Sequence, residues 1–202
     1  ANLGNGTLDE AAAWVEYCNG SNDTEFANLR RRHGYEQPHQ VKYWGLGNEA
    51  YGSWQIGHKS AEDYAKSALE FAKVMKWTDP SLKLVACGGQ EVDWDWEVLK
   101  TCGGSVNYLS AHFYFGPSKE DDPHYSLCAH VSRVEEYVQI LWQLIQAAQR
   151  RFGWRHPLQI ALDEWNVWYR SRGCPHDGRF PLAPPLLEEI YDLTDALVVG
   201  AF

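Results

Sequence analysis

Short apolar runs alternate with amphipathic stretches along most of the chain. Apolar runs of strand length occupy residues 41–49, 82–88, 108–114 and 158–166, and residues 1–4 resemble the end of a further strand. Between these runs, apolar residues recur at helical spacing. The pattern therefore predicts the order strand, helix, strand, helix, repeated about five times.

The predicted helices carry start and stop signals. Thr7–Glu10 forms a capping box, Ser60–Asp63 opens another helix, and Asp79-Pro80 ends it. The remaining helices and loops are expected at these positions: a loop or short helix over 21–38, helices over about 93–102 and 131–152 and from Leu186 onward, and loops over 116–130 and 169–185.

Strands that alternate with helices indicate an α/β fold with a parallel sheet covered by helices. Two architectures fit this order, a doubly wound sheet and a (β/α)₈ barrel. Five units fall short of the eight that a barrel needs. No linker or internal repeat divides the chain, so we expect residues 1–202 to form one partial domain of a longer protein.

Two of the predicted strands finish on a glutamate that is flanked by Asn and Trp. Glu49 ends the run 41–49, and Glu164 lies near the end of the run 158–166. Glycoside hydrolysis needs such a pair, one carboxylic acid to protonate the leaving oxygen and one carboxylate to attack or to activate water. The simpler alternative is that each is an exposed surface acid, the usual situation of Glu.

Aromatic side chains are abundant, with ten Trp and eleven Tyr residues. Trp54, Trp165 and Trp168 are candidates for stacking on sugar rings, although core packing explains any one of them equally well. His112 and Tyr114 are two positions apart on a predicted strand, so their side chains share a face. They are candidates for contacts with the nucleophile or with substrate hydroxyls, and the alternative is a satisfied core pair.

Other chemistries find less support. Gly45–Ala50 formally matches a dinucleotide fingerprint, but the next helix begins only near Ser60, too late to present its N–H groups to a phosphate. No G-x-S-x-G elbow occurs. The loop residues His124, Cys128, His130, Cys174 and His176 match no metal-ligand spacing. We therefore predict neither a metal nor another cofactor.

The net charge and the cysteine content bear on which partners and which compartment the protein has. The net charge is −9 and the longest basic run is Arg30–Arg32, which argues against nucleic-acid binding. No apolar run reaches the length of a membrane span. Five scattered cysteines without C-x-x-C suggest reduced thiols and lean toward a cytoplasmic protein. The compartment and the oligomeric state stay open, with a homo-oligomer among the alternatives.

Several longer motifs together resemble one known family. They are Asn2–Gly4, Trp14–Asn19, Lys42–Glu49, Trp54–His58, Ala72–Pro80, Leu84–Gly88 and Asp163–Tyr169. On these motifs, the chain resembles the α-L-arabinofuranosidases of glycoside hydrolase family 51 over essentially its whole length. The resemblance implies a (β/α)₈ barrel, present here from about strand three to the helix after strand seven.

The resemblance also implies roles for individual residues. Glu49 corresponds to the acid/base, Asn48 to a substrate-binding residue, and Glu164 to the nucleophile. His112 and Tyr114 correspond to a pair near the nucleophile, and Trp168 to a tryptophan beside the sugar pocket. The reaction implied is retaining hydrolysis of terminal arabinofuranosyl units from arabinan or arabinoxylan.

Two alternatives remain open at this point. The first is an endo-acting barrel glycanase that uses the same two glutamates on a β-glucan or xylan, and the second is a non-catalytic sugar-binding barrel. An incomplete barrel exposes strand edges and apolar interior. We therefore expect the 202-residue chain alone to be poorly stable and inactive on an aryl arabinofuranoside, although the longer protein is an enzyme.

Overall fold

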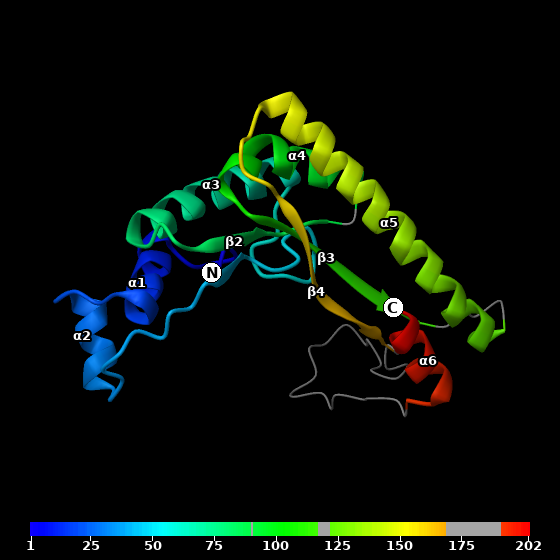
Figure 1. The fold of residues 1–202 in the computed structure, drawn as a ribbon, viewed down its shortest axis with the longest axis horizontal. Coiled ribbons are helices and arrows are strands. Elements are labelled where there is room, and N and C mark those ends of the chain that lie inside the picture. The colour runs from blue at the N-terminus through cyan, green and yellow to red at the C-terminus, as the bar shows by residue number, and fades with distance from the viewer. Residues whose placement is uncertain (90, 117–121, 169–190) are drawn as a thin grey trace, which may run out of the picture. The chain divides into compact units, whose positions relative to one another are not determined.

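The computed structural model describes residues 1–89, 91–116, 122–168 and 191–202 (Figure 1). The chain forms two compact units. Unit 1 comprises Ala1–Ala111 and Ile140–Asp163, and unit 2 comprises His112–Gln139 and Glu164–Phe202. The boundary runs through two strands and one helix, so each unit holds one part of these elements. The predicted loop over 169–185 and the start of a helix at Leu186 lie outside the described residues.

The sheet is parallel, as the alternation of strands and helices predicted. In unit 1 the strands follow the order β1-β2-β3-β4. Tyr43 pairs with Lys83, and Val85 pairs with Tyr108, in parallel register. The strands are β1 (Tyr43–Leu46), β2 (Lys83–Ala86), β3 (Tyr108–Phe115) and β4 (Gln159–Val167). The α/β class is thereby confirmed, with strands slightly shorter or shifted relative to the apolar runs.

Two helices of unit 1 begin where the capping signals indicated. The Thr7 side chain accepts a hydrogen bond from the Glu10 N–H, and the Glu10 carboxylate accepts one from the Thr7 N–H. Ser60 caps the next long helix through the Asp63 N–H. Caps of this kind stabilise a helix by about 1 kcal/mol. The helices are α1 (Leu8–Asn19), α2 (Glu25–Arg32), α3 (Ala61–Thr78), α4 (Val92–Cys102) and the 3₁₀ turn η1 (Gly103–Ser105).

α3 and α4 lie side by side against the sheet of unit 1 (Figure 1). Buried side chains recur on α3 at helical spacing, including Tyr64, Ala68 and Met75. On β1, Trp44 and Leu46 are buried whereas Tyr43 and Gly45 are exposed. The core of unit 1 therefore lies between these helices and one face of the sheet, and the carboxyl ends of the strands lie at one edge.

The long helix α5 (Pro123–Phe152) begins earlier than predicted. The expectation of a loop up to residue 130 was wrong because the polar composition of this stretch hid a start signal. The Asp122 carboxylate accepts hydrogen bonds from the His124 and Tyr125 N–H groups, and a proline follows it at the first helical position. Leu127 is then buried one turn into the helix.

Unit 2 holds the C-terminal parts of β3 and β4, the first half of α5, and α6 (Leu193–Ala201). Asp192 caps α6, so among the described residues the helix begins at Leu193. Phe113 and Phe115 point to the core of this unit, and the Phe202 ring lies near both, with centroid distances of 6.1 and 5.8 Å.

Residues 1–4 do not form a strand end, because residues 1 and 2 have no regular secondary structure and residues 3–5 form a turn. The backbone of Ala1 nevertheless hydrogen-bonds to β1 and its extension, because its amino group donates to the Gly45 carbonyl and its carbonyl accepts from the Gly47 N–H. The opening residues therefore run alongside β1 without completing a ladder.

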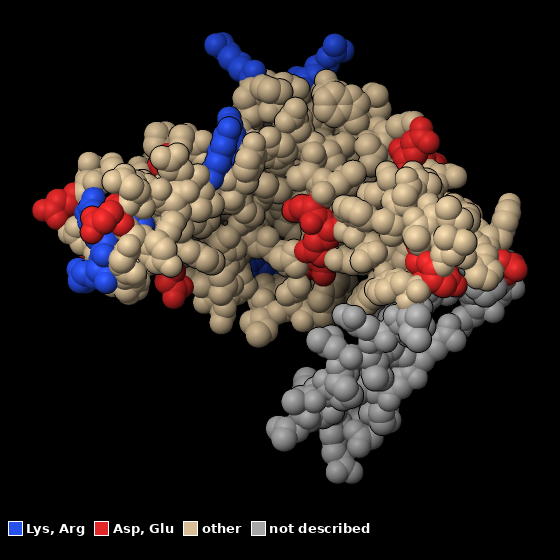
Figure 2. Space-filling view, turned by 60° about the horizontal axis from the view of Figure 1, so that its bottom comes forward, with Lys and Arg blue, Asp and Glu red and all other residues tan. Residues whose placement is uncertain are grey.

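The basic run Arg30–Arg32 has a structural role in part. Arg30 is fully buried, and its guanidinium donates to the backbone carbonyls of Tyr17, Gly20 and Tyr35. On the face shown in Figure 2, the Lys and Arg side chains of the described residues are scattered or lie beside acidic ones. Within the described residues, no helix combines the length and the hydropathy that crossing a membrane requires.

Candidate active site

Glu49 lies in a tight turn directly after β1. Gly47 has a φ of +78° and Glu49 a φ of +43°, both in the left-handed region. A side chain at position 47 would meet the Leu3 Cβ at 3.3 Å, so glycine suits this position for its conformation and for its size. The Glu49 carbonyl accepts a hydrogen bond from the Gly52 N–H at 2.8 Å, which closes the turn.

Two aromatic donors face the Glu49 carboxylate. The Trp54 Nε1–H donates to Oε2 at 2.9 Å, and the Tyr51 hydroxyl lies 3.5 Å from Oε1. The Trp54 ring covers Gly52, where a Cβ would come within 2.3 Å of it. N–H and O–H donors favour the ionised form of a carboxylate. The turn therefore presents a half-buried Glu49 whose charged state is stabilised by its own loop.

Asn48 precedes Glu49 and is exposed. It lines a hollow of about 720 Å³ in unit 1, together with Asn2, Asn5, Trp14 and Trp54. Amide groups and indole rings are suited to hydroxyl hydrogen bonding and to stacking on a sugar ring. Asn48 and Trp54 thus lie together at the hollow that adjoins the Glu49 turn.

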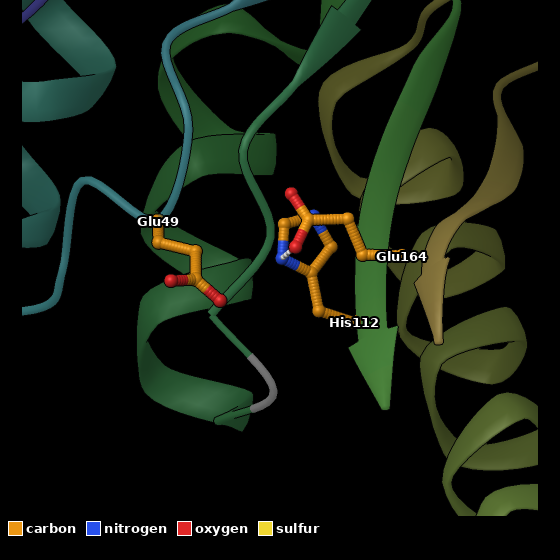
Figure 3. Close-up of side chains that lie close together, drawn as sticks. All are labelled: Glu49, His112 and Glu164. Carbon is orange, nitrogen blue, oxygen red and sulfur yellow. Dashed lines mark ion pairs between the residues drawn. The ribbon is translucent and has the colours of Figure 1, made fainter. Parts of the chain in front are cut away.

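Glu164 lies on β4 and is contacted by two side chains of β3. The Tyr114 hydroxyl donates to Oε2 at 3.0 Å, and His112 Nδ1 lies 3.5 Å from the same oxygen, an ion pair when the imidazole is protonated. Figure 3 shows His112 and Glu164 pointing toward each other from their two strands. His112 is buried, and the Glu164 side chain is one third exposed. Glu49, also labelled in that figure, belongs to unit 1.

The period-two alternation of β3 explains this arrangement. His112 and Tyr114 share the face toward Glu164, whereas Phe113 and Phe115 fill the core of unit 2. Since β3 and β4 are parallel neighbours, residues near their carboxyl ends meet at one height. The sequence prediction that His112 and Tyr114 share a face is confirmed, and the structure brings both to Glu164.

The two tryptophans after Glu164 have different surroundings. The Trp168 ring contacts Tyr114 edge to face, with centroids 5.7 Å apart, and the backbone N–H of Trp168 donates to the Phe115 carbonyl. Trp165 points to the opposite face of β4 and stacks on Phe202 at 5.2 Å. Trp168 therefore lies beside the Glu164 cluster, whereas Trp165 packs within unit 2.

Cys87 and the loop histidines His124 and His130 have hydrogen-bond partners within the protein. Burial raises the pKa of the Cys87 thiol to about 12, although backbone groups of Ala50 and Glu49 act in the opposite direction. Such a thiol stays protonated near neutral pH and is a poor nucleophile. His124 hydrogen-bonds to Thr194, and His130 to the Gly116 carbonyl. Cys174 and His176, also weighed as metal ligands, lie outside the described residues.

Sequence reasoning missed the aromatic setting of Glu49. Trp54 was named as a sugar-stacking candidate, yet its indole also donates to the carboxylate. Tyr51 was not singled out at all. Two aromatic residues within five positions of a strand-end glutamate were the available signal, because a tight turn folds such neighbours back onto the carboxylate.

Comparison with family models gives two matches. A model described as "Alpha-L-arabinofuranosidase 1 domain" matches residues 4–133. A second, described as "Alpha-L-arabinofuranosidase C-terminal domain", matches residues 163–202. The first model includes Glu49, His112 and Tyr114, and the second includes Glu164.

Curated relatives match along almost the whole chain. An intracellular exo-alpha-(1→5)-L-arabinofuranosidase 1 from Bacillus subtilis is 40% identical over 99% of this chain. Alpha-L-arabinofuranosidase C from Emericella nidulans is 38% identical over 100% of this chain. In both cases the match covers 41% of the relative, so the chain spans about two fifths of the length of these relatives.

Solved structures give the same result. An alpha-L-arabinofuranosidase from Thermotoga maritima, described as an arabinose complex, has a TM-score of 0.83 at 40% identity and matches 99% of this chain and 38% of its own. A family 51 alpha-L-arabinofuranosidase from Bifidobacterium longum has a TM-score of 0.84 at 31% identity and matches 100% of this chain and 42% of its own.

Proposed function

Since the chain belongs to the family defined by the alpha-L-arabinofuranosidase 1 domain, we propose that the protein carrying it is a retaining glycoside hydrolase that releases terminal α-L-arabinofuranosyl residues. The substrates are arabinan- or arabinoxylan-type polysaccharides and their oligosaccharides. One observation carries the proposal most directly, namely the carboxylate of Glu164 held by Tyr114 and His112.

The architecture proposed for the longer protein is a (β/α)₈ barrel. The four parallel strands described here, with helices following them in sequence, fit consecutive units of such a barrel. In a barrel the carboxyl ends of all strands open on one face, where the loops carry the catalytic groups. Glu49 follows β1 and Glu164 lies toward the end of β4, so both belong to that face in the proposed fold.

In the first step of the proposed reaction, the Glu164 carboxylate attacks the anomeric carbon. The Tyr114 O–H and the imidazole of His112 hold one carboxylate oxygen, which orients the other for attack. Protonated Glu49 delivers its proton to the departing glycosidic oxygen. Trp54 and Tyr51 then stabilise the carboxylate that Glu49 becomes.

In the second step, Glu49 acts as the base. It removes a proton from water, which attacks the glycosyl ester on Glu164 and releases arabinose with retained configuration. The donors on Glu49 favour the ionised state that this step requires. Asn48 and Trp168 lie beside the two carboxylates in their respective units, and we assign them to substrate binding.

The alternatives are weaker on specific grounds. Several relatives are named as exo-acting (1→5)-L-arabinofuranosidases, which supports removal of terminal units over endo cleavage of a glucan or xylan. A non-catalytic sugar-binding barrel has no need of a glutamate held by a buried histidine and a tyrosine. The same relatives are named intracellular, which supports a location inside the cell.

Trapping the covalent intermediate tests the proposal. The full-length protein that carries this chain is prepared as Glu49→Ala and incubated with 2,4-dinitrophenyl α-L-arabinofuranoside, whose leaving group needs no proton. We expect a pentosyl adduct that peptide mass spectrometry locates on Glu164. Glu49→Ala/Glu164→Ala is the matched control and should carry no adduct. An adduct on another residue, or turnover without one, would contradict the assignment of the nucleophile.

A further inference from the structure

Tyr64 joins the carboxyl ends of two neighbouring strands. This α3 side chain is fully buried, and its hydroxyl donates to the Leu46 carbonyl at 2.6 Å and accepts from the Cys87 N–H at 2.7 Å. Leu46 is the last residue of β1, and Cys87 directly follows β2. One phenol oxygen therefore satisfies two backbone groups at the edge of the sheet from which the Glu49 turn departs.

Trp94 supports Tyr64 from α4. The two rings stack with centroids 5.4 Å apart, and the Trp94 Nε1–H donates to the Cys87 carbonyl at 3.0 Å. Both backbone groups of Cys87 are thus held by aromatic side chains. Gly47 lies against the Tyr64 ring, since a Cβ there would be 3.7 Å from Cε2.

Tyr64 and Trp94 are connected to Glu49 in three ways. Along the chain, Leu46 is followed by Gly47, Asn48 and Glu49 in a turn with two positive φ angles. Through space, the Cys87 thiol lies at the backbone of Glu49 and Ala50. The Trp94 ring also contacts Tyr51 at 5.6 Å, and the Tyr51 hydroxyl faces the Glu49 carboxylate.

We propose that Tyr64 is a positioning residue for the acid/base Glu49, acting through the backbone of Leu46 and Cys87 without touching the substrate. This proposal rests on the proposed function, because it assumes that Glu49 protonates the leaving group. Loss of the hydroxyl leaves a buried carbonyl and a buried N–H without their partner, so the segment must shift to find new ones. The carboxylate at the end of the turn shifts with it.

The test compares two substrates on Tyr64→Phe in the full-length protein. A displaced general acid harms substrates that need protonation, whereas a smaller folded fraction lowers every activity equally. We expect kcat/KM on phenyl arabinofuranoside to fall about tenfold, and kcat/KM on the 2,4-dinitrophenyl analogue to fall at most about twofold. Tyr17→Phe is the matched control, because it removes a hydroxyl of α1 that is hydrogen-bonded to His33 at the end of α2, and it should change neither value.

Equal losses on both substrates would overturn the positioning role. Glu49→Ala run alongside must show the stronger leaving-group dependence; if it does not, the proposed function itself fails, whatever Tyr64→Phe gives. Should Tyr64→Phe not fold, Trp94→Phe keeps a ring beside Tyr64 but removes the donor to Cys87. It should shift the ratio of the two kcat/KM values in the same direction by about two- to threefold, and an unchanged ratio would refute the proposal.

Discussion

Glu49 and Glu164 occupy contrasting settings. Glu49 lies in a left-handed turn, and the donors that reach its carboxylate come from its own loop, two and five residues later. Glu164 lies within a regular strand, and its donors come from the neighbouring strand, 50 and 52 residues earlier in the chain. The Glu49 carboxylate is thus positioned by local turn geometry, and the Glu164 carboxylate by the pairing of two strands.

The difference matches the work proposed for each group. A nucleophile must aim one oxygen at a carbon atom, and a strand that is paired on its neighbour holds a side chain with little freedom. An acid/base must exchange protons in both steps and meet first the leaving group and then water. A loop that carries its own donors permits small adjustments while it keeps the charged state stabilised.

Removing each carboxylate should separate the two roles most strongly. In the full-length protein, we expect Glu164→Ala to lower kcat by at least about 10⁴-fold on all substrates. Glu49→Ala should cost on the order of 10²- to 10⁴-fold on substrates with poor leaving groups and far less on activated ones. Steady-state kinetics on a series of aryl arabinofuranosides measures this.

Added azide distinguishes the roles by stereochemistry. In Glu49→Ala, azide attacks the glycosyl-enzyme and gives an arabinosyl azide of retained configuration. In Glu164→Ala, azide occupies the space of the missing carboxylate and gives the inverted product. NMR of the products decides between them. The reverse pattern would exchange the two assignments, and the same configuration from both variants would reject the pair.

Tyr114→Phe tests the hydrogen bond from β3 to Glu164 and leaves the residues around Glu49 unchanged. The change removes the hydrogen bond to Glu164 but keeps a ring against Trp168. We expect kcat to fall about 10- to 100-fold, because the donor orients the nucleophile and the rest of the site is kept. Tyr125→Phe, on an exposed α5 residue, is the control and should leave kcat unchanged. A Tyr114→Phe enzyme with normal kcat would mean that this hydrogen bond contributes nothing to orientation.

Trp54→Phe tests the hydrogen bond that the loop supplies to Glu49, and among these variants it should have the smallest effect on kcat. Phenylalanine keeps an aromatic ring over Gly52 but removes the N–H that favours ionised Glu49. We expect kcat on aryl arabinofuranosides to fall about two- to fivefold, because the carboxylate that Glu49 becomes then lacks one of its hydrogen-bond donors. Trp77→Phe, an exposed position on α3, is the control. A Trp54→Phe enzyme with unchanged kcat would show that the hydrogen bond from the indole to Glu49 contributes nothing to the reaction.

The sequence predicted helix starts and strand faces best where the signal lay in a few neighbouring residues. The capping groups of α1 and α3 placed both helix starts, and the two-residue alternation of β3 placed His112 and Tyr114 on one face. Asp122-Pro123 was an equally local signal for α5, but the polar surroundings concealed it. The apolar period becomes regular only after the first turns of that helix.

Contacts that depend on loop geometry could be suggested by the sequence but not placed from it. The indole of Trp54 reaches Glu49 because the turn after β1 adopts left-handed angles and Gly52 leaves room for the ring. Neither fact follows from residue spacing. Trp165 and Trp168 were alike as stacking candidates, and only the alternation of β4 and the position of Phe202 separate them.

The left-handed backbone of Glu49 has a consequence for how this position evolves. A non-glycine residue in that region is less stable than in the right-handed one by roughly 1–2 kcal/mol, and Gly or Asn tolerates it better. Selection for thermal stability alone would therefore favour replacing Glu49, and with it would go the carboxylate. The proposed acid/base role accounts for a glutamate at a position where its backbone conformation lowers stability.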